Sequence, residues 1–195
     1  MSPSSRARPG ARERILDAAS GLFYAYGFGA VGIDRIIAEA GVAKASLYHH
    51  FATKDDLVVA YLQRTNQQFW EWIDGEIDPE APATERLIAI FRAVEQQATS
   101  PSCRGCTFQV TAGEFPDPAH PAHATAAAHK LEALARFETL AREAGLRDPE
   151  ALAAALLLLM DGAWAAARMF GDDNHGRNLV GVVETLIAAH ALDAS

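Results

Sequence analysis

Apolar residues recur at helical spacing through most of the chain, and glycine and proline mark the breaks between the helices they predict. Apolar positions three and four residues apart are typical of helices that bury one face. The pattern predicts helices at about 11–26, 33–40, 44–51, 54–77, 84–98, 106–115, 122–144, 149–170 and 178–192. Alanine and leucine are abundant and β-branched runs are few, so we expect an all-α fold.

The second and third predicted helices have the pattern of a helix-turn-helix over about residues 32–51. Residues 33–40 carry apolar side chains at 33, 36, 37 and 40, which is the spacing of a buried helical stripe. Gly41 follows, and glycine tolerates the left-handed backbone that often ends a helix. In the next helix we expect Leu47, His50 and Phe51 to lie towards the core. The opposite face is then left for solvent or a partner.

The outward face of residues 44–51 suits a helix end that lies in the major groove of DNA. We predict Lys44, Ser46 and His49 nearest the bases, because such polar side chains can reach base edges. Tyr48 and Lys54 are predicted mainly to contact phosphate. The full predicted DNA-binding set is Arg35, Lys44, Ala45, Ser46, Tyr48, His49 and Lys54. The alternative from the pattern alone is a small three-helix module with a solvated polar face.

Charge is distributed unevenly along the chain. The 195 residues carry a net charge of −8, which by itself disfavours nucleic acid as a partner. Residues 1–65, however, carry a net charge of +2, and the remainder carries −10. A mildly basic module on an acidic body is typical of local phosphate binding. The arginines at 6, 8, 12 and 14 could reach the DNA backbone or minor groove, or belong to a solvated tail.

Several short motifs between residues 12 and 62 have the order and spacing of one protein family. They are Arg14-Ile15-Leu16-Asp17-Ala18-Ala19, Leu22-Phe23, Tyr26-Gly27-Phe28, Ala40-Gly41-Val42, Leu47-Tyr48-His49-His50-Phe51 and Lys54-Asp55-Asp56-Leu57. This run, about the first third of the chain, resembles the DNA-binding domain of the TetR (tetracycline repressor) family of bacterial transcription regulators. One departure is Gly32, where the family commonly has a serine or threonine that caps the second helix.

The resemblance implies a helical homodimer that binds a palindromic operator in double-stranded DNA and usually represses transcription. It also implies that an unidentified small-molecule effector binds the C-terminal domain and releases the DNA. We therefore expect a DNA-binding domain over residues 9–69 and a regulatory and dimerisation domain over residues 70–195. The predicted helix at 54–77 crosses this boundary. A lengthwise shift of it would change the separation of the two recognition helices, which must match half-sites roughly 34–36 Å apart or a multiple of that.

The last two predicted helices are too apolar for one small domain to cover easily. Residues 149–170 are apolar nearly all round, with Asp148 expected as N-cap and Pro149 as the first helical residue. Residues 178–192 carry a further apolar stripe. Pairing these helices across a two-fold axis would cover both in a four-helix bundle. The family uses its last two helices in this way, so we expect a homodimer through them; burial within one subunit is the alternative.

Cys103 and Cys106 form a C-x2-C pair. With His120, His123 and His129 farther along, a Cys2His2 zinc site is conceivable, and a thiol redox pair is a second possibility. A second C-x2-C pair is missing, so packing of small residues in a loop is the favoured interpretation. The sequence therefore predicts no metal and no cofactor. A redox- or metal-responsive sensor using the two cysteines is kept as the alternative function.

Aromatic and polar residues on different predicted helices could enclose a ligand in the C-terminal domain. The candidates for this pocket are Phe91, Phe108, Gln109, Trp164, Arg168 and Met169. One amide and one arginine among aromatic side chains would suit an apolar ligand with an acidic group. An ordinary apolar core made of the same residues is the alternative.

Patterns of enzymes, export and membrane insertion are missing from the sequence. There is no Gly-rich phosphate loop, no G-x-S-x-G and no H-E-x-x-H, so we do not expect an enzyme. Residues 1–14 are polar and arginine-rich, unlike a secretory signal. The longest apolar run, residues 151–160, is too short to span a bilayer. We therefore expect a soluble, cytoplasmic protein without a membrane partner.

Overall fold

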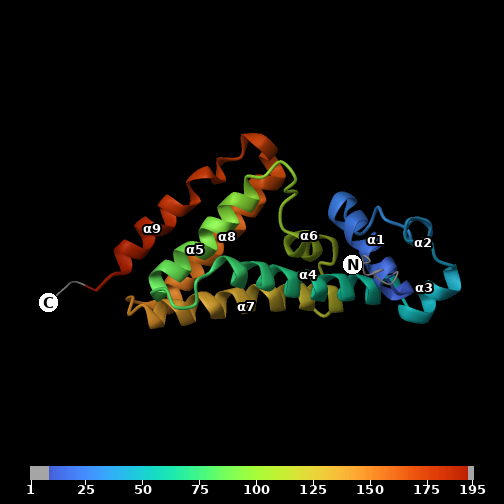
Figure 1. Ribbon diagram of the computed structural model, residues 1–195, viewed down its shortest axis with the longest axis horizontal. Helices are drawn as coiled ribbons and strands as arrows, with labels where there is room; N and C mark the ends of the chain where they lie inside the picture. The colour runs from blue at the N-terminus through green and yellow to red at the C-terminus, as the bar shows by residue number, and fades with distance from the viewer. Residues whose placement is uncertain (1–8, 193–195) are drawn as a thin grey trace, which may run out of the picture.

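The computed structural model describes residues 9–192, apart from the side chain of Asp172, and these residues form an all-α fold (Figure 1). No strand occurs among them, so the predicted fold class is confirmed. The α-helices are α1 (Ala11–Tyr26), α2 (Ile33–Ala40), α3 (Lys44–His50), α4 (Lys54–Glu76), α5 (Ala83–Ala98), α6 (Thr107–Glu114), α7 (Pro121–Glu143), α8 (Pro149–Phe170) and α9 (Leu179–His190). Two short 3-10 helices, η1 (Gly171–Asp173) and η2 (His175–Asn178), connect α8 to α9.

The helices form two packed groups that α4 joins (Figure 1). At one end of the molecule, α1, α2 and α3 gather around the beginning of α4. In the elongated body, α7 packs against α4 and α8, while α5 packs against α7, α8 and α9. Because α4 runs without a break through residue 70, where we placed the domain boundary, it links the two groups as one continuous rod.

The core of the N-terminal group draws side chains from separate segments. Phe28, Leu47 and Leu57 are each almost completely buried there. The ring centroid of Phe28 lies 5.1 Å from that of Phe23 and 6.0 Å from that of Tyr61. Burying each such side chain contributes about 2 kcal/mol to folding. These contacts fix the orientation of α1 and α3 relative to the start of α4.

Side-chain capping sets the beginning of α4 but not that of α8. Thr53 Oγ1 accepts a hydrogen bond from the amide of Asp56, and the Asp56 carboxylate accepts one from the Thr53 amide, which forms a capping box. Asp148 does occupy the N-cap position of α8, but its φ and ψ of 54° and 59° are left-handed and its side chain makes no cap hydrogen bond. The predicted positions of Asp148 as N-cap and Pro149 as first helical residue are therefore confirmed, but without a side-chain capping bond. The preceding amide of Arg147 donates to the carbonyl of His190, which ties this tight turn to α9 instead.

The apolar helix α8 is covered on only part of its circumference. It packs against α5, α7 and α9, yet Leu158 and Met169 are 73% and 75% exposed. On α9, Val182 is 41% exposed. Burial within the described chain therefore does not account for the apolar character of the last two helices, because part of their apolar surface stays exposed.

By length and composition, α8 is the one described helix that could cross a membrane. The apolar run of residues 151–160 is too short to span a bilayer, but the whole of α8, at 22 residues, is long enough and apolar enough by this measure. The core helix of a water-soluble protein passes the same test, and the packing of α8 against α5, α7 and α9 fits that role.

Candidate nucleic-acid interface and ligand cavity

Helices α2 and α3 form a helix-turn-helix at the end of the molecule. Gly41 ends α2 with φ 60° and ψ 46°, the left-handed conformation expected for it. Leu47 is completely buried and Phe51 is nearly so, which anchors α3 on the N-terminal core. His50 is exposed, so its predicted core position is wrong. The chain leaves the helix at Phe51, whose φ of −138° is extended; Phe51 takes the inward position, and His50 lies outside beside His49.

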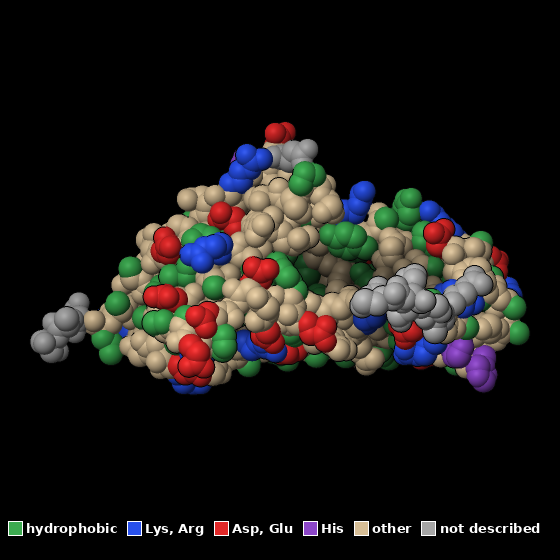
Figure 2. All heavy atoms as spheres, in the orientation of Figure 1, with side chains coloured by type: hydrophobic (Ala, Val, Ile, Leu, Met, Phe, Trp, Pro, Cys, Tyr) green, Lys and Arg blue, Asp and Glu red, His purple; other side chains and the backbone are tan. Residues whose placement is uncertain are grey.

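The predicted outward face of α3 is at the surface. Lys44, Ala45, Tyr48 and His49 are exposed, and Ser46 is half-buried. Figure 2 shows histidine and basic side chains gathered at the end of the molecule where α3 lies. These positions agree with the predicted outward face, while contact with DNA stays a prediction.

The basic residues around α3 have only loose partners. Lys44 Nζ lies 3.2 Å from a carboxylate oxygen of Asp34, and both side chains are mostly exposed, so the pair contributes little and can be exchanged for a phosphate contact. The guanidinium of Arg35 lies 4.1 Å above the ring of Tyr26. Arg14 donates to the carbonyl oxygens of Ala40 and Pro9. The arginines at positions 6 and 8 lie outside the described residues.

Lys54 makes a hydrogen bond within the protein that the sequence did not indicate. Its Nζ donates a hydrogen bond of 2.6 Å to the carbonyl oxygen of Phe28, and the side chain is half-buried. An ammonium group has three donors, so a phosphate contact is still available to it. Lys54 therefore supports the turn after α1 whether or not it contacts DNA.

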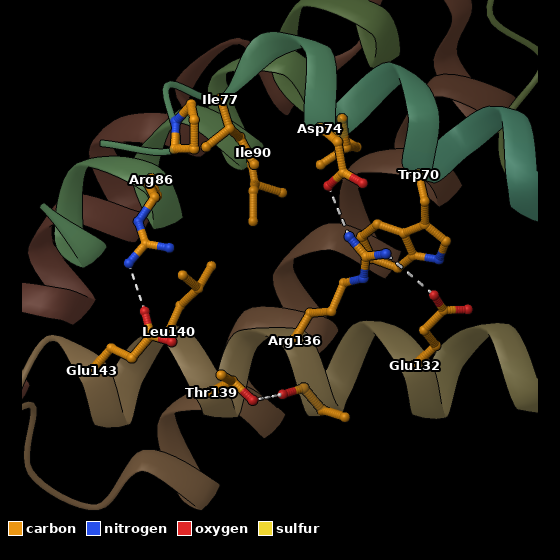
Figure 3. A pocket seen from close by; sticks show the side chains of 13 residues that line it. Trp70, Asp74, Ile77, Arg86, Ile90, Glu132, Arg136, Thr139, Leu140 and Glu143 are labelled. Carbon is orange, nitrogen blue, oxygen red and sulfur yellow. Dashed lines mark hydrogen bonds and ion pairs between the residues drawn. The ribbon is translucent and has the colours of Figure 1, made fainter. Parts of the chain in front are cut away.

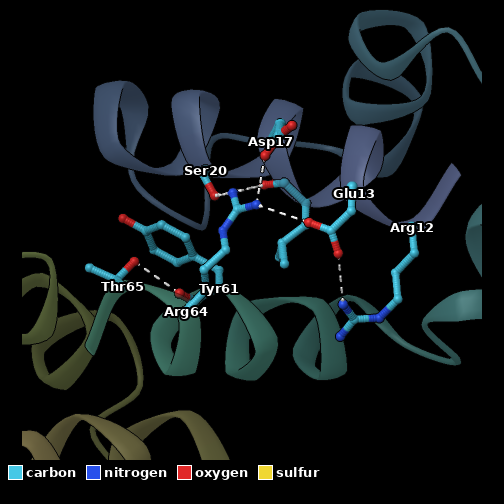
Figure 4. Close-up of polar contacts among 8 residues, drawn as sticks. Arg12, Glu13, Asp17, Ser20, Tyr61, Arg64 and Thr65 are labelled. Carbon is cyan, nitrogen blue, oxygen red and sulfur yellow. Dashed lines mark hydrogen bonds and ion pairs between the residues drawn. The ribbon is translucent and has the colours of Figure 1, made fainter. Parts of the chain in front are cut away.

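Sequence reasoning also missed Arg64, which holds α4 against α1 (Figure 4). Its guanidinium lies 2.6 Å from a carboxylate oxygen of Asp17 and donates to the carbonyl oxygen of Leu16 at 2.9 Å. The side chain also donates to the hydroxyl of Ser20. Arg64 and Asp17 are 47 residues apart, so no local pattern pairs them. This network ties the middle of α1 to α4 through contacts with both side chains and backbone.

A cavity of about 260 Å³ lies beside α6, between the two groups of helices. Figure 2 shows the surface hollowed, with hydrophobic side chains, in the region between α1 and α5. We call this space the α6 cavity. Its lining residues are Tyr24, Tyr61, Thr65, Gln68, Phe69, Trp72, Gln97, Gly105, Cys106, Thr107, Phe108, His129 and Trp164. The lining is largely aromatic and includes no aspartate, glutamate, lysine or arginine.

The polar groups of the α6 cavity are neutral and mostly engaged. The hydroxyls of Tyr61 and Thr107 lie 2.9 Å apart in a hydrogen bond. Tyr24 Oη accepts a hydrogen bond from the amide of Arg104 at 2.8 Å. His129 stacks on Phe108 with ring centroids 3.7 Å apart, and burial, with a smaller effect of the Lys130 charge, lowers its pKa to about 3. At neutral pH the wall of the cavity therefore carries no formal charge.

The structure places only two of the six predicted pocket residues, Phe108 and Trp164, in the α6 cavity. Phe91 is completely buried in the core, with its ring 5.3 Å from that of Phe137. Gln109 donates to the carbonyl of Asp161, and exposed Arg168 donates to the carbonyl of Arg104.

Met169 is exposed at the end of α8. The predicted pairing of an amide and an arginine in one pocket with these aromatics is therefore wrong. Helical spacing does not show which way a helix is rotated against its neighbours, so the sequence could not separate core, pocket and surface here.

The C-x2-C pair does not meet the histidines. Cys103 and Cys106 are buried free thiols. His120 contacts Asp55, His123 contacts the carbonyl of Phe115, and His129 contacts Asn66. Among the described residues no group of three or more potential ligands could hold a metal ion, so the Cys2His2 hypothesis is not supported.

A second cavity, of about 540 Å³, lies between α4, α5 and α7 and has a different chemistry (Figure 3). We call it the α4–α7 cavity. Arg136 pairs with Asp74 at 2.8 Å, and Arg86 pairs with Glu143 at 2.5 Å. The Arg136 guanidinium also lies 4.0 Å above the ring of Trp70. In Figure 3 these ion pairs bridge the helices around the cavity, so its charges are already matched within the protein.

A helix-turn-helix with an exposed, basic recognition face, joined by a long helix to a helical body with a cavity, defines a DNA-binding regulator of transcription. Comparison with known proteins agrees with this class. Residues 15–61 match the family model for bacterial regulatory proteins of the tetR family, and residues 83–182 match that for the tetracyclin repressor-like C-terminal domain. The chain belongs to the TetR family, whose members are transcriptional regulators and not enzymes.

Individual relatives extend this agreement along the chain. The crystal structure of SCO4454, a TetR-family transcriptional regulator from Streptomyces coelicolor, is 36% identical, covers 93% of this chain and 96% of its own, and superposes with a TM-score of 0.88. The uncharacterized regulator YxaF of Bacillus subtilis is 30% identical over 109 residues, 55% of this chain and 57% of YxaF. The transcriptional repressor KstR2 of Mycolicibacterium smegmatis is 30% identical over 98 residues, 48% and 46%. The chain thus spans about half the length of these curated relatives.

Proposed function

We propose that the protein is a homodimeric repressor that binds a two-fold symmetric operator and is released by a small molecule in the α6 cavity. The single observation that carries this proposal is the exposed face of α3, which combines a weakly paired lysine with small and flat polar side chains. The matched relative KstR2 is a repressor, which supports the direction of control. A regulator of transcription acts on DNA, so we place the protein in the cytoplasm.

The proposed DNA contacts are divided between bases and phosphates. Lys44, Ser46 and His49 lie nearest the bases, and Ala45 lets the helix approach them closely. Tyr48, Lys54 and Arg35 contact phosphate. In this arrangement Arg35 leaves part of its contact with Tyr26 when DNA binds.

The proposed dimer interface uses the uncovered apolar surface of α8 and α9. Leu158, Met169 and Val182 are large apolar side chains in water, and pairing two copies across a two-fold axis would bury them. Substituting Leu158→Asp should therefore shift the protein from dimer to monomer in sedimentation at micromolar concentration. A wild-type protein that sediments as a monomer would contradict the interface.

The proposed effector of the α6 cavity is uncharged, flat and aromatic. No charged side chain lines the cavity, and the nearby ammonium of Lys130, which contacts Cys106, is already paired with Asp161. Desolvating an unpaired ligand charge there would be costly. Aromatic walls favour stacking and edge contacts with ligand rings. At about 260 Å³ the cavity is near the small end of ligand sites, which suits one or two fused rings.

The test titrates the protein into labelled DNA from upstream of its own gene, with scrambled DNA as control, at several salt concentrations. Binding should be tighter on the native fragment by at least about a thousandfold, with a two-fold symmetric footprint. Adding 2-naphthamide should release the DNA, whereas 2-naphthoate, of the same shape but charged, should not. Equal, salt-dependent binding to both DNAs would contradict operator recognition, and equal release by both compounds would contradict the effector class.

A further inference from the structure

Helix α6 extends from the α6 cavity to the helix-turn-helix group. Thr107 and Phe108, at its beginning, line the cavity. Glu114, at its end, reaches residues 27–29, which we call the 27–29 turn. This turn connects α1 to the segment that enters α2. In Figure 1, α6 lies between α1 and the body of the molecule.

The Glu114 carboxylate accepts two backbone hydrogen bonds from the 27–29 turn. Oε1 accepts from the amide of Phe28 at 3.1 Å, and Oε2 accepts from the amide of Gly29 at 2.6 Å. Two successive amides that point to one carboxylate make a charge-assisted pair of bonds. Neither amide belongs to a helix, so without Glu114 both would need water as their hydrogen-bond acceptor.

Two glycines give the carboxylate its room. A Cβ added at Gly27, whose φ is 79°, would lie 2.5 Å from Glu114 Oε1. A Cβ added at Gly29 would lie 3.3 Å from Oε2, which is crowded but leaves the backbone unstrained. Glycine at positions 27 and 29 therefore leaves space for the Glu114 carboxylate, although Glu114 is more than eighty positions away in the sequence.

The other side of the turn is held by α4. Lys54 donates to the carbonyl of Phe28, while Glu114 accepts from its amide. The Phe28 ring also lies 5.6 Å from that of Phe115, the residue after α6. A displacement of α6 would therefore pull on the backbone that leads into the helix-turn-helix, against the fixed contact with α4.

We propose that Glu114 is a positioning residue that couples the wall of the α6 cavity to the helix-turn-helix through the 27–29 turn. This inference rests on the proposed function for its biological meaning, but the coupling itself is a property of the protein alone. Effector binding beside Phe108 shifts α6, the two Glu114 bonds transmit the shift to the turn, and the recognition helix changes its position relative to the body.

The first experiment needs neither DNA nor effector. It measures hydrogen exchange of the Phe28 and Gly29 amides by NMR in the full chain, for wild type, Glu114→Ala, Phe108→Leu and the double variant. Glu114→Ala should raise exchange at both amides about twofold to tenfold, because the carboxylate is exposed and its bonds are partly replaced by water. Glu71→Ala removes another exposed carboxylate, whose one hydrogen bond among the described residues is with Gln67, so it is the matched control and should change nothing at the turn.

The double variant tests the coupling. Phe108→Leu perturbs the cavity wall while keeping it apolar, and it should alter exchange at Phe28 and Gly29 in the wild-type background. In the Glu114→Ala background this effect should disappear, because non-additive effects show that Phe108 acts on the turn through Glu114. Unchanged exchange in Glu114→Ala, or an undiminished effect of Phe108→Leu in the double variant, would overturn the proposal.

The second experiment joins the coupling to function. Glu114→Ala should still bind the operator, but 2-naphthamide should release it at least about fivefold less effectively than it releases wild type, within the usual range of allosteric coupling. If Glu114→Ala responds as wild type does, the coupling role is refuted. If wild type itself neither binds the operator nor is released, the proposed function fails, and the exchange measurements still decide the role of Glu114.

Discussion

The recognition face of α3 and the α6 cavity are two binding regions of opposite character. The first has a lysine at the surface, in an ion pair whose members are 62% and 87% exposed. The second is walled by aromatic rings with no charged side chain. A surface of loosely paired charges attracts a polyanion at a strength that depends on salt. A neutral aromatic cavity selects by shape and by the absence of ligand charge. Effector binding in the α6 cavity can therefore change DNA binding at α3 only through the structure that connects the two regions.

The largest predicted effect is that of a charge reversal on α3, which should change DNA binding and leave effector binding unchanged. Lys44→Glu should weaken operator binding about a hundredfold or more, because each copy loses a base or phosphate contact and gains repulsion. The same variant should bind 2-naphthamide as wild type does, measured by quenching of tryptophan fluorescence. Thr139→Ala, at an exposed position of α7 outside the proposed interfaces, serves as a control for surface substitution. Loss of less than about threefold in operator affinity would remove Lys44 from the interface.

Acid titration tests whether the cavity wall is neutral. The folded-state pKa of His129 is lowered to about 3, while the unfolded chain takes up this proton near pH 6.5. The unfolded state therefore binds more protons between these values, so stability falls as the pH drops below about 6.5. By pH 5 the loss from this residue should be about 2 kcal/mol.

The measurement is urea unfolding at pH 7 and pH 5 for wild type and His129→Gln. Because other groups also titrate, the informative quantity is the difference between the two proteins in their loss of stability. A variant that loses as much stability as wild type would show that His129 is not held neutral by burial. Binding of 2-naphthamide to folded wild type should stay constant over the same range.

Removing one ring from the cavity should have a smaller effect. Trp72 is half-buried and lines the α6 cavity, so Trp72→Ala should weaken 2-naphthamide binding about tenfold through lost stacking and apolar contact. Operator affinity without ligand should be unchanged. Trp70→Phe is a useful comparison, since Trp70 lines the α4–α7 cavity instead. Equal weakening by both variants would mean that the compound does not occupy the α6 cavity.

The N-terminal site could be predicted because its residues are contiguous. One helix of seven residues carries most of the proposed contacts, so spacing alone placed Lys44, Tyr48 and His49 outside and Leu47 inside. The exception is His50, the last residue of α3, which stays outside because the extended backbone at Phe51 carries the Phe51 ring into the inward position. Gly41 was likewise placed correctly, since its left-handed turn is a local requirement.

The C-terminal cavity could be predicted only in part because it depends on how several helices are rotated. Phe108 and Trp164 were predicted for the pocket, whereas Tyr24, Tyr61 and Trp72, which come from other helices, were not. No feature of the sequence indicated the contact of Glu114 with the 27–29 turn. An acidic residue at the end of a short helix has the pattern of a solvated side chain, and only the fold brings it to two free amides.

The smallest predicted effect concerns Lys54, which is a proposed phosphate contact and also holds the 27–29 turn. If it contacts phosphate, Lys54→Met should weaken binding to all DNA sequences alike and lower the slope of log affinity against log salt by about one unit per half-site. If it only holds the carbonyl of Phe28, affinity should fall through a loosened turn while the salt slope stays unchanged. Hydrogen exchange at Phe28 and Gly29 distinguishes these roles, because loosening the turn would raise it and losing a phosphate contact would not. A flattened slope with unchanged exchange would assign Lys54 to the DNA surface alone, and both changes together would show that it contacts phosphate and also holds the 27–29 turn.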